Sequence, residues 1–294
     1  MEKYGLDLSS FQTNVNFNNI KQAGYSFVIL RINTWSKSVK ASVKDPKFEE
    51  YYRKATEAGL NVGAYWFTYA NTVDYAKSEA KTCVQWLKGK RFNYPIYLDL
   101  ERKEQFEKGK AFCTELVKAF CSEMEKNGFF VGVYCSTYWY TNYVDEKTRE
   151  RYACWIAEWS SKCKYTGTYG VWQNGTTSCL GVNESKSAVD HNIAYIDYPS
   201  IIVKNGFNGY SVKILDDTSF LCLGENSSFA FIFKKILQVA YEKKLTTFAP
   251  TNNYTYDKEA QNAVNQILEK WGYKPNGNVG KNFIEMAFDK IIKG

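Results

Sequence analysis

The sequence has 294 residues, of which 45% are apolar and 17% aromatic, and its net charge is +7. This length suits one large domain and one small one, and the charge lacks the dense Lys/Arg runs of a nucleic-acid groove. No apolar run reaches the roughly 18 residues that span a bilayer, so we expect no membrane insertion.

The cysteines and the single histidine narrow the chemistry further. None of the eight cysteines forms a Cys-x-x-Cys pair, so we expect free thiols made in a reducing compartment. His191 is the only histidine, which excludes His-rich zinc sites and leaves one candidate for Ser-His-Asp or Cys-His chemistry. We expect no metal and no cofactor. Residues 1–4 run straight into a predicted strand, so we also expect synthesis without a signal peptide.

Strands and helices alternate through the first half of the chain. Apolar runs predict strands at 3–8, 25–32, 60–69, 94–101 and 129–135, and helical periodicity predicts helices at 17–23, 46–58, 74–87 and 108–126. This β-α repeat implies a parallel sheet with right-handed crossovers.

After residue 136 the pattern changes. Three further strands are predicted at 153–159, 170–173 and 189–193, with little helical signal between them. The fold class is therefore α/β: a TIM-like barrel of five β/α units followed by three strands lacking helices. An open doubly wound sheet is the alternative, but no Gly-x-Gly-x-x-Gly turn follows the first strand.

The strand at 94–101 carries the most informative residues. Side chains alternate along a strand, so Tyr97, Asp99 and Glu101 share one face, with the two carboxylates roughly 6–7 Å apart. Like charges in a poorly hydrated site cannot both ionise easily, so one pKa should rise. An acid beside a carboxylate is what glycosidic bond cleavage requires. The alternative is a strand that runs out into solvent, with Asp99 as a helix cap and Glu101 exposed.

In a parallel barrel the functional face is the C-terminal end of the strands. Asp7 ends the first strand, Asp99 and Glu101 end the fourth, and Asp190 lies in the eighth, which neighbours the first once the barrel closes. We therefore expect four carboxylates at one mouth. Rings that stack on sugar faces would line it, and the candidate substrate-binding residues are Tyr65, Phe67, Tyr134, Trp155, Trp172 and Gln173.

Six short blocks, in order along residues 3–200, resemble glycoside hydrolase family 25, the muramidase-type lysozymes common among phage endolysins. The blocks are Tyr4-Gly5-Leu6-Asp7-Leu8-Ser9-Ser10-Phe11-Gln12, Gly63-Ala64-Tyr65-Trp66-Phe67, Leu98-Asp99-Leu100-Glu101, Trp155-Ile156-Ala157, Trp172-Gln173 and Val189-Asp190-His191-Asn192. Two positions depart from many relatives, Trp66 and His191, and both are candidates for altered substrate fit.

The resemblance implies an enzyme that acts on bacterial peptidoglycan at the cell wall. It implies cleavage, with retention, of the β-1,4 bond between N-acetylmuramic acid and N-acetylglucosamine. Glu101 would be the general acid, Asp99 a nucleophile or the group that orients a substrate-assisted attack, and Asp7 and Asp190 positioning groups. The alternatives are a chitinase-like glycosidase, an N-acetylglucosaminidase and a non-catalytic wall-binding protein. Tyr97 stands where the chitinase motif needs an aspartate, and a dead relative would usually lose a carboxylate.

The end of the chain predicts a second domain. We expect a catalytic domain over 1–200, a linker over 201–209 and a helical domain over 210–294, with helices at 229–242, 257–271 and 281–292. The turn-rich loop 272–280 between two of these helices resembles that of a three-helix peptidoglycan-binding domain. The alternative is a helical appendage that stabilises the barrel or mediates oligomerisation, and the sequence leaves the oligomeric state open.

Overall fold

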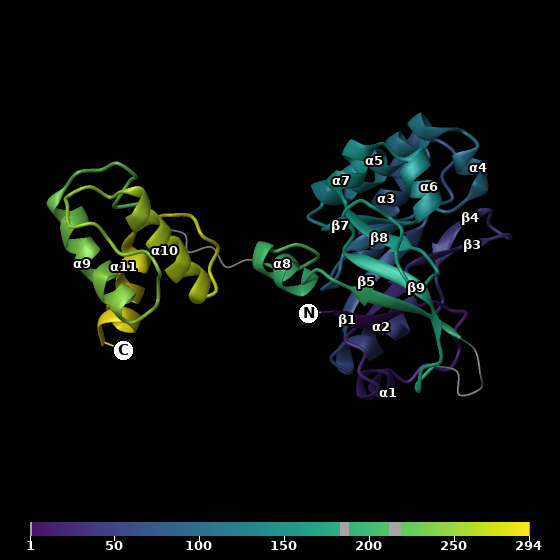
Figure 1. Cartoon of the computed structure of the whole chain (residues 1–294), viewed down its shortest axis with the longest axis horizontal. Helices are drawn as coiled ribbons and strands as arrows, with labels where there is room; N and C mark the ends of the chain where they lie inside the picture. The colour runs from purple at the N-terminus through teal and green to yellow at the C-terminus, as the bar shows by residue number, and fades with distance from the viewer. Residues whose placement is uncertain (1, 183–187, 212–218, 294) are drawn as a thin grey trace. The chain divides into compact units, whose positions relative to one another are not determined.

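The computed structural model describes residues 2–182, 188–211 and 219–293, and these divide into two compact units, residues 1–210 and 211–294 (Figure 1). Among the described residues, none of the helices is both long enough and apolar enough to cross a membrane. All eight cysteines are free, as the sequence predicts.

Unit 1 is a closed barrel of eight strands among the described residues. Their order around the barrel is β1-β10-β9-β8-β7-β6-β5-β2, and every neighbouring pair is parallel except the two that involve β10. The predicted strand count is thus confirmed, whereas the expectation of an all-parallel barrel is wrong for the last strand. The strands are β1 (Lys3–Leu8), β2 (Phe27–Arg31), β5 (Asn61–Phe67), β6 (Ile96–Asp99), β7 (Val131–Ser136), β8 (Ala153–Ala157), β9 (Val171–Thr177) and β10 (Val189–Ala194).

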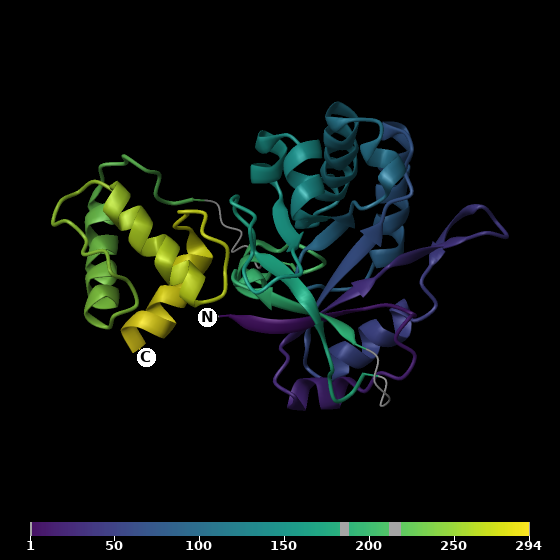
Figure 2. The same cartoon turned by 45° about the vertical axis from the view of Figure 1, so that its right-hand side comes forward.

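Helices follow the first five barrel strands, and no helix of the described residues lies between β8 and β9 or between β9 and β10, as predicted. A hairpin of β3 (Asn33–Ser36) and β4 (Ala41–Lys44), which the sequence reading missed, projects from the barrel after β2 (Figure 2). The helices of unit 1 are α1 (Phe17–Gln22), α2 (Phe48–Glu57), α3 (Val73–Leu87), α4 (Lys103–Phe106), α5 (Lys110–Lys126), α6 (Thr137–Tyr143), α7 (Glu146–Arg151) and α8 (Tyr198–Asn205).

Alternation along the strands separates two cores. Leu6 and Leu8 of β1 face the outer layer, where the helices cover the barrel. The interior is filled with rings, including Phe27, Tyr97 and Trp155. A Cβ at Gly5 would lie 2.3 Å from the Phe27 ring, so a larger residue there would displace this filling. Because aromatic side chains fill the barrel interior, the polar side chains near the strand ends pack on a closely packed, rigid layer of rings.

The predicted linker over 201–209 is wrong. Residues 198–205 form α8, whose N-cap Asp197 accepts a hydrogen bond from the backbone of Ser200. Tyr198 and Ile202 of this helix are buried in the interior core of the barrel. The apolar side chains of α8 therefore pack into the interior core of the barrel, and the boundary between the two units falls after residue 210.

Unit 2 contains three α-helices in its described residues, α9 (Ser228–Glu242), α10 (Lys258–Lys270) and α11 (Lys281–Ala287), and α11 continues as a π-helix over Phe288–Lys293. Its core includes Phe233, Ile267 and Phe283. Lys234 is also buried, and its ammonium group donates to Thr251, Asn253, the Thr255 carbonyl and Asp257. These bonds tie the loop before α10 to α9.

Candidate active site

The four predicted carboxylates meet at one mouth of the barrel. Asp7 and Asp99 lie at the ends of β1 and β6, Glu101 follows β6, and Asp190 lies near the start of β10. Asp7 and Asp190 hydrogen-bond to each other. The charge of Glu101 acts on Asp99, as does that of Asp7, and the charge of Asp190 acts on Glu101. Side chains that are 183 residues apart in sequence therefore form one electrostatic group.

The reversal of β10 is what brings Asp190 to this mouth. The antiparallel register pairs Leu6 with His191 and Lys3 with Ala194, so Asp190 stands beside Asp7 at the end where β1 finishes. The expectation that Asp190 shares the mouth is thus met by a strand that begins there rather than ends there. His191, between Asp190 and Asn192, points to the outer side, where it stacks on Tyr4 and meets Tyr25 edge-on.

Loss of hydration raises the pKa of all four carboxyl groups. Burial, followed by the Asp190 charge, raises the pKa of Asp7 to about 7, although the amides of Asn192 and Gln173 hold it down. Burial raises the pKa of Asp99 well above its usual value, with further contributions from Glu101 and Asp7. Four acids this close titrate as one set and carry fewer than four charges at neutral pH.

Glu101 differs from the others because its side chain is exposed at the rim. Its pKa is nevertheless raised, first by partial loss of hydration and then by Asp190. The sequence predicts that Asp99 and neighbouring carboxylates raise this pKa, and of these groups the one that acts on Glu101 is Asp190. An exposed carboxyl group with a raised pKa, above a buried carboxyl group, is suited to donate a proton to a bound substrate.

Gln173 positions Asp7 rather than facing outward as a simple substrate contact. Its Nε2 donates to Asp7 Oδ2 at 3.1 Å, and its Oε1 accepts from Tyr134 and from Trp159 Nε1, both at 3.0 Å. Asn192 Nδ2 donates to the same Asp7 oxygen at 2.8 Å. Two amides thus fix the carboxyl group of Asp7 in one orientation.

The predicted aromatic residues divide into two groups. Tyr65 and Tyr134 lie near the carboxylates. Burial raises the pKa of both phenols most, and the charges of Asp7 and Asp99 raise it further. Phe67 is half-buried beside Asp99, its partner in the sheet register.

Trp155 and Trp172 do not line the mouth. Trp155 is 1% exposed inside the barrel, where its Nε1 donates to Asn192 Oδ1 at 2.8 Å, so it supports the site from below. Trp172 lies in the outer core, because it alternates with the inward-facing Val171 and Gln173. The prediction that these two rings bind substrate is therefore wrong. Trp66, offered as a determinant of substrate fit, is also fully buried in the outer layer.

Sequence reasoning missed several residues at this end of the barrel. Trp159 is 62% exposed and is held by its bond to Gln173. Arg31 pairs with the buried Asp45 at 2.7 Å, lies 4.7 Å from the Phe11 ring centroid and lowers the pKa of Asp99. The period-two pattern of β2 could have identified Arg31, since Phe27 and Ile29 share its inner face.

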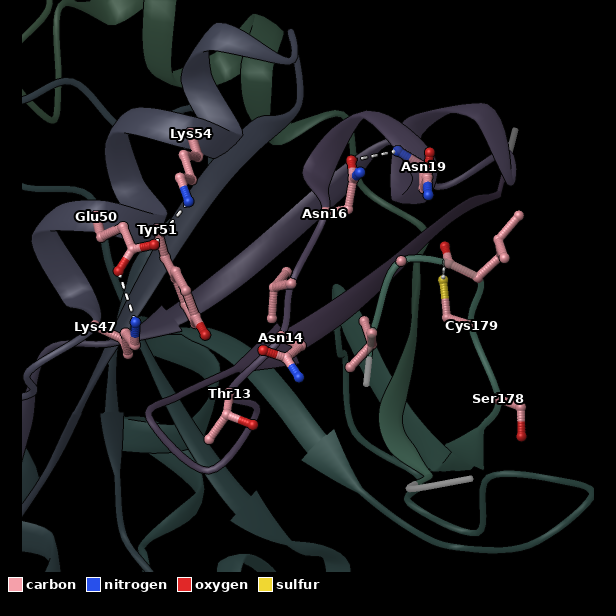
Figure 3. Close-up of a pocket in the computed structure, with 14 residues that line it drawn as sticks. Thr13, Asn14, Asn16, Asn19, Lys47, Glu50, Tyr51, Lys54, Ser178 and Cys179 are labelled. Atoms are coloured by element: carbon pink, nitrogen blue, oxygen red, sulfur yellow. Dashed lines mark hydrogen bonds and ion pairs between the residues drawn. The ribbon is translucent and has the colours of Figure 1, made fainter. Parts of the chain in front are cut away.

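A separate pocket of about 840 Å3 lies between α1, α2 and the loop after β9, and none of the four carboxylates lines it (Figure 3). Its charged residues pair with one another: Glu50 bridges Lys47 at 2.8 Å and Lys54 at 2.7 Å. These pairings lower the pKa of Glu50 to about 2. Because the two lysines lower its pKa, Glu50 is unsuited to act as a general acid in this pocket. No set of three or more metal-binding side chains occurs in the part of the chain that the structure describes.

A closed mixed barrel with interacting carboxyl groups at one mouth is typical of glycoside hydrolases. The chain belongs to glycosyl hydrolases family 25, whose sequence model matches residues 6–180.

Individual relatives agree with this assignment. A probable GH family 25 lysozyme 2 of Dictyostelium discoideum is 32% identical over 137 residues, covering 45% of this chain and 60% of the relative. An autolytic lysozyme of Clostridium acetobutylicum is 23% identical over 209 residues, covering 70% and 60%. The chain thus spans 60% of the length of both curated relatives. The crystal structure of the CTP1L endolysin has the same fold, with a TM-score of 0.58 at 22% identity over 68% of this chain and 69% of that one.

Proposed function

We propose that this protein is a muramidase that hydrolyses the β-1,4 bond between N-acetylmuramic acid and N-acetylglucosamine in bacterial peptidoglycan, with retention. The observation that carries the proposal is the group of four interacting carboxyl groups, with Glu101 at the rim and Asp99 buried beneath it. Family membership supports the same chemistry.

In the proposed reaction Glu101 is the general acid. It protonates the glycosidic oxygen of the leaving sugar, and its raised pKa favours the protonated form that this step requires. The resulting carboxylate then takes a proton from water as the intermediate is hydrolysed.

Asp99 acts on the opposite side of the bond in one of two ways. It attacks the anomeric carbon as nucleophile, or it orients the acetamido group of the substrate for that attack. Asp99 Oδ1 is buried and has no hydrogen-bond partner among the described residues, so an acetamido N–H is a fitting donor. This favours the substrate-assisted route. Asp7 and Asp190 hold the set in position and share a proton.

Product analysis tests the proposal. Purified peptidoglycan is digested and the products are identified by mass spectrometry, and NMR of the fresh products reports the anomer. Muramic acid at the new reducing end, first as the β-anomer, is the expected result. Glucosamine there would identify a glucosaminidase, cleavage of chitin oligomers in preference to peptidoglycan would identify a chitinase-like enzyme, and binding without new reducing ends would identify a wall-binding protein.

We also propose that unit 2 binds the cell wall. The support is its three-helix core and the loop over 272–280 between α10 and α11. Hydrogen–deuterium exchange of the full chain carrying Glu101→Gln, with and without soluble wall fragments, tests this. Protection of backbone amides within 219–293 is expected, and protection confined to unit 1 would assign only a structural role to unit 2.

The proposed place of action is the bacterial cell wall, and the proposed setting is phage lysis. Cytoplasmic expression in a susceptible host tests the setting. Lysis is expected only after the inner membrane is permeabilised, and lysis without permeabilisation would point to a protein that reaches the wall by itself.

A further inference from the structure

A second pocket, of about 570 Å3, lies between the β3–β4 hairpin and the segments that follow β5 and β6. Aromatic and basic side chains dominate its lining. The residues that matter here are Trp35, Lys40, Tyr69, Tyr75, Arg102 and Lys108.

This pocket lies next to the carboxylates. The Tyr69 ring is 4.8 Å from that of Phe67, which pairs with Asp99 in the sheet. The charges of Asp99 and Arg102 both act on the Tyr69 phenol. Arg102 also follows Glu101 directly in the chain. A glycan held at the carboxylates would therefore extend toward this pocket.

Its aromatic wall suits a sugar ring. Trp35 is 38% exposed and its ring centroid lies 5.1 Å from that of Tyr69. The Arg102 guanidinium lies over the same Tyr69 ring at 5.5 Å, and Nη1 donates to the Tyr69 carbonyl at 3.4 Å. The exposed Trp35 ring can pack on the C–H face of a sugar, while the guanidinium over the neighbouring Tyr69 ring can bind an anionic substituent.

The basic groups retain capacity for such an anion. Lys108 donates a hydrogen bond to the Asn71 carbonyl. This acceptor is neutral, so the bond does not compensate the positive charge of Lys108. The ion pair of Arg102 with Glu104 is 3.4 Å long and Glu104 is 67% exposed, so this pair is weak. In the pocket of Figure 3, by contrast, Lys47 and Lys54 both pair with Glu50 at normal distances.

We propose that this pocket binds carboxylate groups on the glycan and thereby selects muramic-acid-containing strands over neutral ones. The carboxylate has two sources, the free lactyl group of muramic acid and the stem peptide attached to it. The inference rests on the proposed muramidase function, and it adds Arg102 and Lys40 as specificity-determining residues.

The test measures binding of glycan strands to proteins that all carry Glu101→Gln, which prevents hydrolysis. Three strand preparations are compared: strands with stem peptides, peptide-free strands with free lactyl carboxylates, and peptide-free strands whose carboxylates are converted to amides. The variant is Lys40→Gln with Arg102→Gln. The matched control is Lys37→Gln with Lys103→Gln, which removes two charges from the same segments outside the pocket lining.

The double variant should lose about tenfold in affinity for carboxylate-bearing strands, as expected for two partly exposed ion pairs, and nothing for amidated strands. Loss with stem-bearing strands alone assigns the stem peptide, and loss with peptide-free strands alone assigns the lactyl group. Equal loss on amidated strands, no loss, or the same loss in the control would overturn the inference. If the double variant folds poorly, the protein carrying Glu101→Gln alone is tested instead. It should bind carboxylate-bearing strands more tightly than amidated strands, and salt should weaken this preference. Equal affinity for both kinds of strand would overturn the inference. Product analysis with the wild type separately tests the proposed function.

Discussion

The carboxyl group of Asp7 offers a sharp test of the site's electrostatics. Asp7 Oδ2 accepts hydrogen bonds from Asn192 and Gln173, and Asp7 shares a hydrogen bond with Asp190. A protonated Asp7 donates to Asp190 while keeping both amide bonds. The side chain introduced by Asp7→Asn has the same shape: its oxygen replaces Oδ2 and its NH2 group donates to Asp190. The variant therefore mimics protonated Asp7 at every pH.

The size of the effect follows from the pKa. Burial raises the pKa of Asp7 from 3.8 to about 7, and this rise corresponds to about 4 kcal/mol. The folded state binds the proton more tightly than the unfolded state does, so the stabilisation is complete below pH 3.8. It is lost as pH rises to about 7. The wild type should lose up to about 4 kcal/mol in unfolding free energy over this range, and Asp7→Asn should lose less.

The measurement is urea unfolding at a series of pH values between 4 and 8. Tryptophan fluorescence reports mainly on unit 1, because Trp271 is the only tryptophan in unit 2. Asp197→Asn is the control: hydrogen bonds from Ser200 lower the pKa of Asp197 below 3.8, so its stability contribution is lost only below this pH range, and its profile should parallel that of the wild type. Parallel pH profiles for the wild type and Asp7→Asn would refute the assignment of a shared proton to Asp7 and Asp190.

Three further predictions test other parts of the structure. Glu101→Gln should abolish release of reducing ends without shifting the unfolding midpoint, and Asp7→Asn should weaken cleavage less; a folded, active Gln variant would refute Glu101 as the acid. Trp159→Ala should weaken glycan binding about tenfold through loss of an exposed ring, and Trp159→Phe should weaken it less because a ring remains. Titration calorimetry measures both affinities. If Trp159 only supported Gln173 through its Nε1 hydrogen bond, both variants would lose the same affinity. Lys234→Met should destabilise unit 2 by about 3 kcal/mol, because Asp257 loses a buried partner; scanning calorimetry measures this, and cleavage of soluble glycan should not change.

The barrel could be predicted from sequence because its signals are local. Apolar runs and helix-ending glycines define strands and helices within a dozen residues, and they are enough to count the eight strands. The inward direction of Gln173 and the outward direction of Trp172 also follow from the two-residue period. Assigning both to the mouth ignored that alternation.

The remaining features depend on contacts distant in sequence. Helix α8 packs against the barrel because Tyr198 contacts the cluster of rings that includes Tyr97. In the sequence, the short segment of α8, with a proline near its start and a glycine after it, has the same pattern as a linker. Arg31 gains its role from Asp45, which lies 14 residues away on the far side of the hairpin. No local sequence pattern predicts the contact of Tyr198 with the interior rings or that of Arg31 with Asp45.

The direction of β10 is the feature on which the site depends most. If β10 ran parallel to β1, its C-terminal end at Ala194 would stand at the mouth. Asp190 would then lie four residues deeper, about 13 Å down the barrel, among the rings of the interior core. A carboxyl group there would have no aqueous exit and no access to Asp7 at the rim. Reversal instead places Asp190 beside Asp7 and leaves Asn192 one step below, where it donates to Asp7 and accepts from Trp155. The same strand thus supplies a charge that adds to burial in raising the pKa of Asp7 and of Glu101, and the amide that orients Asp7.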